Sequence, residues 1–324
     1  MSYARKCTGF AAIVTLVACT AAPSSQPQSP NVLPAALHTG PSPHGSWMDP
    51  SATSQRLLYV SDTGNDAVYV YGASSNNLVG TLTHFSQPLG ECVDAKSDVW
   101  IVDSNGLTEY AHGGTKAIGS ISMYPRYYGD HPYSCAIDPT SGEIAISIIN
   151  RYQGNDAGLV LICDSEGDCT SYVTHARAYI YFVSYNKNGD LYADGIKIDK
   201  NILWMAMRPQ GRVFQKFTIK GATIKSPGAL VNAEGVFSVG APGSSGNSII
   251  YQVAADGTVT GTTQLSQANG CNQFAIAGNT KSARVTCPND DGANVTKYDY
   301  PAGGDPVVTI KGKFARPFAA VYSN

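Results

Sequence analysis

A pattern of short apolar runs repeats along most of this chain, and the repeat limits what the chain can fold into. Five-residue runs of the kind seen at 58–62 (LYVSD) and 99–103 (VWIVD) begin at residues 58, 99, 144, 191, 236 and 283. Successive starts are therefore 41, 45, 47, 45 and 47 residues apart. A regular period of this length is typical of arrays in which one small unit recurs and each unit packs against its neighbours.

The unit at residues 88–121 shows what each repeat contains. Four short apolar runs alternate there with turn-forming stretches, among them Ser104-Asn105-Gly106 and His112-Gly113-Gly114. This alternation predicts a four-stranded antiparallel sheet. Four strands within a period of about 40–45 residues are typical of one blade of a β-propeller. We therefore predict an all-β fold, a six-bladed β-propeller of four-stranded antiparallel blades.

The first and last units together predict how the ring closes. The innermost strand of a unit usually follows a Pro or Gly, as at Pro88, Pro132, Pro227 and Gly270, but the unit that begins at residue 57 has no such strand before it. Residues 317–322 (PFAAVY) have the composition of the missing strand. We expect the C-terminal strand to pair with the first blade, which closes the ring and removes its open edge.

The N-terminus has the features of an export signal. Residues 1–18 have a basic start followed by an apolar run that is too short to span a bilayer. The run ends in Leu16-Val17-Ala18-Cys19, which resembles the lipobox of bacterial lipoproteins. That resemblance implies lipidation of Cys19 and a bacterial membrane anchor, on the outer membrane if the cell has one, facing the periplasm or the exterior. The alternative is an ordinary secretory signal with a chance cysteine.

Residues 19–54 are rich in Pro and Ser and lack periodic apolar patterning, so we interpret them as a tether. Trp47 and Met48 are the exception, because two large apolar residues need a surface. They pack against the first blade or, alternatively, form a partner-binding motif. The predicted domains are thus a signal at 1–18, a lipidated tether at 19–54 and a propeller at 55–324.

The repeats resemble the six-bladed propellers of the NHL-repeat, SMP-30/gluconolactonase-like and YVTN-like group. The resemblance covers residues 57–324 and rests on stretches such as 57–62 (LLYVSD) with 67–71 (AVYVY) and on 135–142 (CAIDPTSG). It is specific for architecture. The group contains binding platforms, lactonases and lyases, so the resemblance implies the fold without choosing an activity.

Six cysteines are left once Cys7 is removed with the signal and Cys19 is assigned to lipid, and an even number in an exported protein favours disulfides. Cys163 and Cys169 flank a turn and should face each other across two strands. Cys271 and Cys287 become partners if their hairpin turns near residue 279. Cys92 and Cys135 lie on the innermost strands of consecutive blades, where they are either bonded or two buried thiols.

Propellers of this group usually bind ligands at the face made by the connections between consecutive blades. Those connections are basic and aromatic in this chain, which suits an anionic saccharide, a sugar acid or a carboxylate-bearing peptide. Nearby aspartates could instead neutralise this collar. The expected ligand-binding residues are Arg126, Tyr127, Tyr128, His131, His84, Arg177, His175 and Arg316.

Catalysis has less support from the sequence. A lactonase-like enzyme would need a divalent metal in the central tunnel, and the innermost strands offer Glu91, Asn232 and Asn272 as dispersed candidates. We therefore expect a binding or scaffolding module without a cofactor or metal, with a metal-dependent hydrolase of the lactonase type as the alternative. The formal net charge of −2 argues against nucleic acid as a partner, and we expect a monomer.

Overall fold

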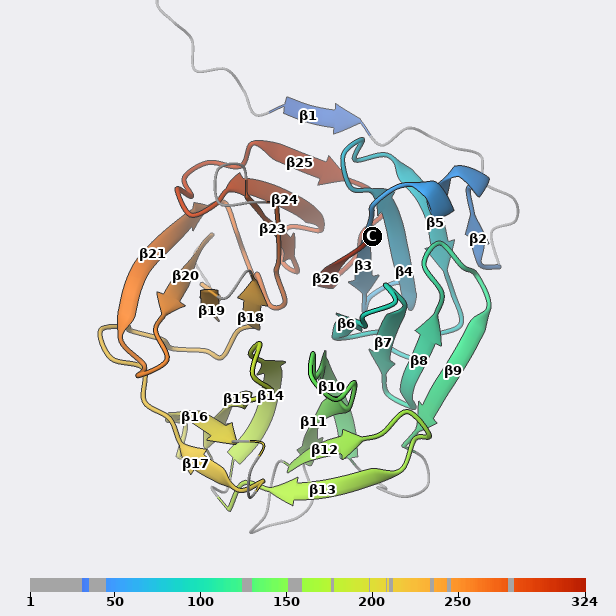
Figure 1. Ribbon diagram of the computed structural model, residues 1–324. Coiled ribbons are helices and arrows are strands. Elements are labelled where there is room, and N and C mark those ends of the chain that lie inside the picture. The colour runs from blue at the N-terminus through green and yellow to red at the C-terminus, as the bar shows by residue number, and fades with distance from the viewer. Residues whose placement is uncertain are drawn as a thin grey trace, which may run out of the picture.

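The computed structural model describes residues 31–34, 45–123, 130–150, 159–175, 178–197, 199–207, 209, 212–233, 236–243, 246–278 and 283–324. These residues form six antiparallel sheets arranged as blades around a central axis, which confirms the predicted six-bladed propeller (Figure 1). Within the described part of the chain, the only helical element is the short 3₁₀ helix η1 (Pro50–Ser54). None of its helices is long and apolar enough to cross a membrane.

Each blade is a meander whose strands are hydrogen-bonded in the order innermost to outermost. The first three blades are β26 (Pro317–Ser323), β3 (Leu57–Asp62), β4 (Ala67–Gly72) and β5 (Leu78–Leu82); β6 (Glu91–Val93), β7 (Val99–Asp103), β8 (Gly106–Tyr110) and β9 (Ala117–Ser122); and β10 (Asp130–Ile137), β11 (Ile144–Asn150), β12 (Leu159–Cys163) and β13 (Cys169–Val173).

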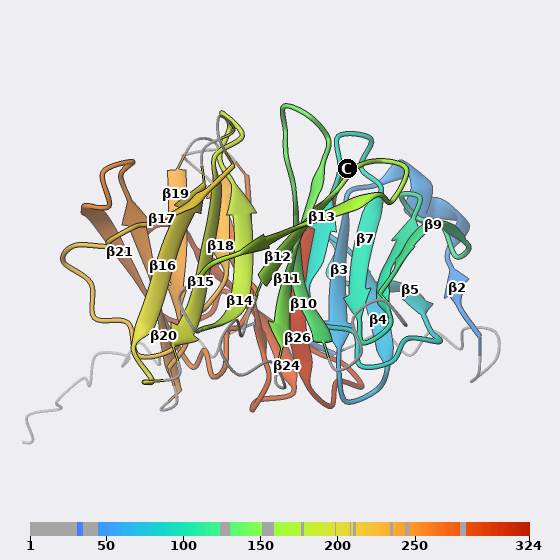
Figure 2. The same cartoon turned by 90° about the horizontal axis from the view of Figure 1, so that it is seen from below.

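The other three blades follow the same plan. They are β14 (Ala178–Tyr185), β15 (Leu191–Lys197), β16 (Ile202–Met207) and β17 (Phe214–Lys216); β18 (Leu230–Ala233), β19 (Val236–Ala241), β20 (Asn247–Val253) and β21 (Val259–Ser266); and β22 (Ala275–Ala277), β23 (Arg284–Asn289), β24 (Asn294–Asp299) and β25 (Val308–Lys311). Strands run between the two faces of the disc, and the C-terminus lies near the face at the top of Figure 2.

The ring closes as the sequence predicts. β26 is the innermost strand of blade 1 and pairs antiparallel with β3 along its length, from Pro317 opposite Asp62 to Ser323 opposite Leu57. Ala319 and Ala320 on β26 are fully buried. The last strand therefore joins both ends of the propeller in one sheet.

Part of the predicted tether packs on the outer edges of the propeller. β2 (Trp47–Met48) pairs with β5, and Met48 packs against the core of blade 1, as predicted for these two residues. Gly80 on β5 lets this strand approach, because a Cβ at that position would collide with the Met48 sulfur. β1 (Asn31–Pro34) pairs in parallel with β25 of blade 6.

Serine side chains on second strands tie neighbouring blades together at the hub, where the innermost strand carries a β-bulge. Ser61 accepts a hydrogen bond from the backbone N–H of Ala319 and donates one to the carbonyl oxygen of Leu89 in blade 2. Ser147 in blade 3 likewise donates to the carbonyl oxygen of Tyr181 in blade 4, at 2.6 Å. The hydroxyls compensate for ladder bonds that the bulges remove.

Asp194 takes the corresponding position in blade 4. Its Oδ1 accepts a hydrogen bond from the backbone N–H of Phe182 at 2.9 Å, and the backbone of Gly228 in blade 5 also donates to this carboxylate. The side chain is fully buried, and its Oδ2 has no hydrogen-bond partner among the described residues. Burial raises the pKa of Asp194 well above its usual value despite these bonds.

The two predicted hairpin disulfides form, and so does the third pair, which the sequence left open. Cys163 pairs with Cys169 across a hairpin and Cys271 pairs with Cys287 within blade 6. Cys92 and Cys135 are bonded as well, with their Cα atoms 5.6 Å apart, so this bridge joins the innermost strands of blades 2 and 3. The blades approach each other closely enough at the hub for a covalent link.

Candidate functional site

A cavity of about 240 Å³ lies in the hub and is lined mainly by the innermost strands of blades 2, 3, 4 and 5. Its wall is formed by the last residues of β10 and β14, so the cavity lies toward the face where these strands end. The lining residues with polar side chains are Glu91, Ser134, Ser184, Tyr185, Asn232 and Gln273. Among the described lining residues there is one carboxylate and no Lys, Arg or His.

Glu91 is the exceptional residue of this wall. It is 1% exposed, and neither carboxyl oxygen has a hydrogen-bond partner among the described residues. Burial raises the pKa of Glu91 well above its ordinary value, because removal from water penalises the charged form. An unsatisfied buried carboxyl group is costly to a fold, so it requires a separate explanation.

Gln273 holds the backbone of Glu91 from the opposite side of the ring closure. Its Nε2 donates to the carbonyl oxygen of Glu91 at 2.6 Å, and its Oε1 accepts from the N–H of Glu91 at 3.2 Å. The backbone of Gln273 also bonds to Phe318 and Ala320 on β26. This carboxamide therefore imitates a strand partner and connects blades 6, 1 and 2 beside the cavity.

Aromatic rings fill the hub beside the cavity. Tyr133 on β10 contacts Tyr181, Phe182 and Phe318, with ring centroids 5.0, 5.4 and 5.2 Å apart. Phe182 and Phe318 are stacked at 6.4 Å and both are buried. Burial raises the pKa of Tyr133, which therefore stays neutral. We call these four residues the aromatic cluster.

The collar residues that the structure describes do not line the cavity. Arg126, Tyr127, Tyr128 and Arg177 lie outside the described residues. All four described ones are exposed: His84, His175 and Arg316 lie on three different connections between blades, and His131 is the second residue of β10. Their expected role in ligand binding stays a prediction.

Arg316 forms a salt bridge with an aspartate, which agrees with the alternative that nearby aspartates neutralise the collar. Its Nε lies 3.0 Å from the Oδ1 of Asp290. The hydrogen bond to Asp290 is the main cause that raises the pKa of Arg316. Asp62 nearby is fully buried and accepts hydrogen bonds from the backbone N–H groups of Ala315 and Arg316, so it anchors this loop.

The lactonase alternative named three candidate metal ligands, and the structure brings two of them together. Glu91 and Asn232 line the same cavity, whereas Asn272 is not part of its wall. The carbonyl oxygen of Asn272 accepts a hydrogen bond from the backbone N–H of Ala229. Neither Gln273 nor Asp194 was predicted from the sequence, although the alignment of the second strands places Asp194 at the position of Ser61 and Ser147.

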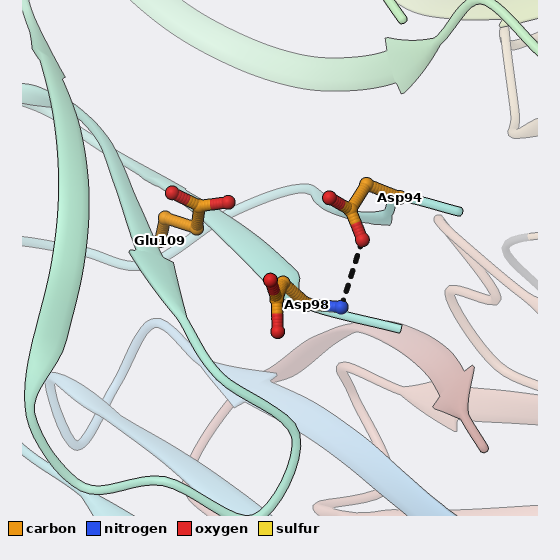
Figure 3. Close-up of side chains that lie close together, drawn as sticks. All are labelled: Asp94, Asp98 and Glu109. Carbon is orange, nitrogen blue, oxygen red and sulfur yellow. Dashed lines mark hydrogen bonds between the residues drawn. The ribbon is translucent and has the colours of Figure 1, made fainter. Parts of the chain in front are cut away.

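A second acidic group lies on blade 2, away from the hub cavity. Asp94, Asp98 and Glu109 can each offer an oxygen atom, and these atoms all lie within 4.8 Å of one another (Figure 3). One oxygen of Asp94 accepts hydrogen bonds from the backbone N–H groups of Lys96 and Asp98, so it shapes the turn. Burial, and then the charges of Asp98 and Asp94, raise the pKa of Glu109. The three residues are only partly buried.

No protein-family model matches the sequence, and no curated protein matches it. The structure is similar to solved propellers. A protein of unknown function from Bacteroides caccae has a TM-score of 0.59 at 12% identity, over 83% of this chain and 99% of that one. A calcium-binding regucalcin from Agrobacterium tumefaciens has a TM-score of 0.57 at 15% identity, over 85% and 92%.

A luciferin-regenerating enzyme is also similar, with a TM-score of 0.53 at 11% identity, over 83% of this chain and 95% of that one. This chain shares the fold of these proteins. At such identities the likeness establishes shared architecture and leaves activity open.

Proposed function

We propose that this protein is a lipid-anchored, extracytoplasmic binding or scaffolding module, and that its ligand binds in the hub cavity. The observation that carries the proposal is Glu91, a residue that lines the cavity and whose two carboxyl oxygens are buried without a hydrogen-bond partner among the described residues. Groups of this kind persist where function requires them, because the fold alone gains nothing from them. The cavity is smaller than most drug-binding pockets, which suits a small molecule.

A small-probe experiment tests binding in the cavity. Saturation-transfer NMR on the full chain with n-butanol, n-butyrate and n-butylammonium should detect at least one probe. Asn232→Phe, which places a ring at the half-buried wall position, should abolish that signal, whereas Ile118→Phe on an exposed edge strand should leave it intact. Asn232→Leu serves where the larger ring impairs folding. Signals that survive both wall variants would overturn binding in this cavity.

A metal-dependent hydrolase of the lactonase type is the second candidate, and it is favoured by the same orphaned oxygens. Glu91 and Asn232 would hold the cation, which would polarise a lactone carbonyl as a Lewis acid. The two residues fit the start of such a coordination sphere, since both offer oxygen atoms.

Melting scans with CaCl₂, MgCl₂ and ZnCl₂, together with hydrolysis of γ-butyrolactone, separate the two candidates. Stabilisation by a metal and turnover that are both lost in Glu91→Gln would establish the hydrolase. Neither effect is expected if the protein is a binding module.

The anchor requires its own test. Cys19→Ser should move the protein from the detergent phase to the aqueous phase, because the acyl chains on the cysteine would supply the membrane attachment. The melting temperature should not change, since the strands of the six blades lie between Leu57 and Ser323. Recovery of the variant in the detergent phase would exclude lipidation at this position.

A further inference from the structure

The chemistry of Glu91 limits what can bind beside it. An ionised carboxylate only accepts hydrogen bonds, so a ligand that binds the ionised form of Glu91 must supply N–H or O–H donors or a positive charge. No cationic side chain lines the described wall. An anion would add repulsion to a carboxylate that is already desolvated.

The single carboxylate in the described wall further limits the class of ligand. A single carboxylate balances one positive charge, whereas a divalent ion would keep an excess charge in a poorly solvated place. Calcium also takes six to eight oxygen ligands, usually with several carboxylates, whereas Glu91 is the single carboxylate among the described lining residues. Phe182 lines the same cavity, and aromatic faces attract organic cations. The wall thus suits one positive charge carried on a partly apolar body.

We propose that the hub cavity binds a small monovalent organic cation, a primary ammonium compound whose N–H groups donate to Glu91 and Asn232. This inference rests on the proposed binding function and specifies its ligand class. At ~30 Å³ per water-sized group, a cavity of about 240 Å³ admits roughly eight non-hydrogen atoms. Ligand entry draws the carboxyl group, which is buried in the free protein, toward the ammonium.

Binding of such a cation is coupled to proton release. Burial holds Glu91 toward its protonated form, and the ammonium requires the ionised form. Tyr59 on β3 is the titratable group that interacts with Glu91, and burial raises its pKa to about 12. Tyr185 lines the same cavity, and burial raises its pKa too. Both tyrosines stay neutral below pH 9, so the released proton comes from Glu91. Affinity should therefore rise with pH until the ammonium itself deprotonates.

Isothermal titration of the full chain with n-butylammonium, n-butanol and n-butyrate tests the class, because these probes share size and differ in charge. We expect n-butylammonium to bind at least about tenfold more tightly than n-butanol, and n-butyrate to bind most weakly. Repeating the titration in buffers of different ionisation enthalpy should reveal proton release. Glu91→Gln should remove both the tenfold preference and the proton release.

Asp194→Asn is the matched control, because it removes an equally buried carboxyl group that does not line the cavity. It should keep the preference for n-butylammonium. Glu91→Asp, which retains the charge on a shorter side chain, should keep part of the preference and guards against a folding defect in Glu91→Gln.

The outcomes separate the ligand class from the proposed function. Cavity-dependent binding of n-butanol or n-butyrate without preference for n-butylammonium would overturn the class and leave the binding module standing. Preference for n-butylammonium in both Glu91→Gln and wild type would overturn the role of Glu91. Binding of none of the probes would overturn both proposals, and binding of CaCl₂ with lactone turnover would support the hydrolase.

Discussion

Four aromatic rings pack together in the hub, whereas Glu91 beside them, the first residue of β6, is buried with neither carboxyl oxygen bonded among the described residues. Phe182 and Phe318 of the aromatic cluster stabilise the fold through burial and ring contacts. Glu91 costs stability. Packing therefore accounts for the aromatic cluster, whereas Glu91 calls for a functional explanation.

Deleting residues 317–324 disrupts the aromatic cluster most completely and has the largest expected effect on stability. The deletion removes β26, exposes the inner edge of β3 and takes Phe318 from the cluster. Each large apolar side chain lost costs ~1.5–3 kcal/mol, and domain stabilities are only ~5–15 kcal/mol. The truncated chain should unfold or aggregate when melting is followed by circular dichroism. Deleting residues 23–30 as a control should change little, and equal melting temperatures for the two deletions would refute closure by β26.

Phe318→Ala tests the aromatic cluster without removing strand β26. The change deletes a buried ring that contacts both Tyr133 and Phe182, so it should cost about 3–5 kcal/mol in the free energy of urea unfolding. Ile118→Ala is the control, because Ile118 is 56% exposed on β9 and should cost well under 1 kcal/mol. Similar losses in the two variants would mean that the cluster does not stabilise the hub.

Gln273→Ala tests the hydrogen bonds by which Gln273 connects the backbone of Glu91 to the strand that carries Phe318. It leaves the N–H and carbonyl groups of Glu91 buried and unpaired, at about 1–3 kcal/mol for each group that finds no water. Hydrogen exchange of the Glu91 amide should accelerate together with the loss in stability. Gln273→Glu keeps the acceptor and loses the donor, so it should restore only part of the protection. Unchanged exchange at Glu91 would show that this bridge does not hold the strand.

The repeat predicted most of the fold because four strands and one period per blade leave few alternative arrangements. The missing strand before residue 57 and the spare strand at 317–322 were complementary, and this predicted the closure. The cavity was harder to foresee. Bulges in β10, β14 and β26 change which side chains face the hub, and no sequence pattern marked them. Glu91 was named as a dispersed candidate, but only packing reveals that its oxygens lack partners.

Glu91→Gln has the smallest expected effect on stability at acidic pH. The pH dependence of that effect tests whether the buried carboxyl group destabilises the fold. Because burial raises the pKa of Glu91 above its ordinary value of 4.5, the protonated form favours the folded state. Its contribution to stability is complete below about pH 4.5 and is lost as pH rises toward the folded-state pKa. The glutamine variant has no such loss. The two melting temperatures should therefore differ little at pH 4.5, and the variant should become the more stable protein as pH rises, by ~2–4 °C for each kcal/mol of difference.

The control for that comparison is Glu166→Gln, which changes an exposed carboxylate on a hairpin turn and should give a melting curve parallel to wild type at every pH. Asp194→Asn should lie between the two, because Asp194 is as buried as Glu91 but its anion receives backbone hydrogen bonds from Phe182 and Gly228. If the melting temperature of Glu91→Gln also parallels that of wild type from pH 4.5 to 9, the carboxyl group does not destabilise the folded state. The burial of Glu91 would then need no functional explanation.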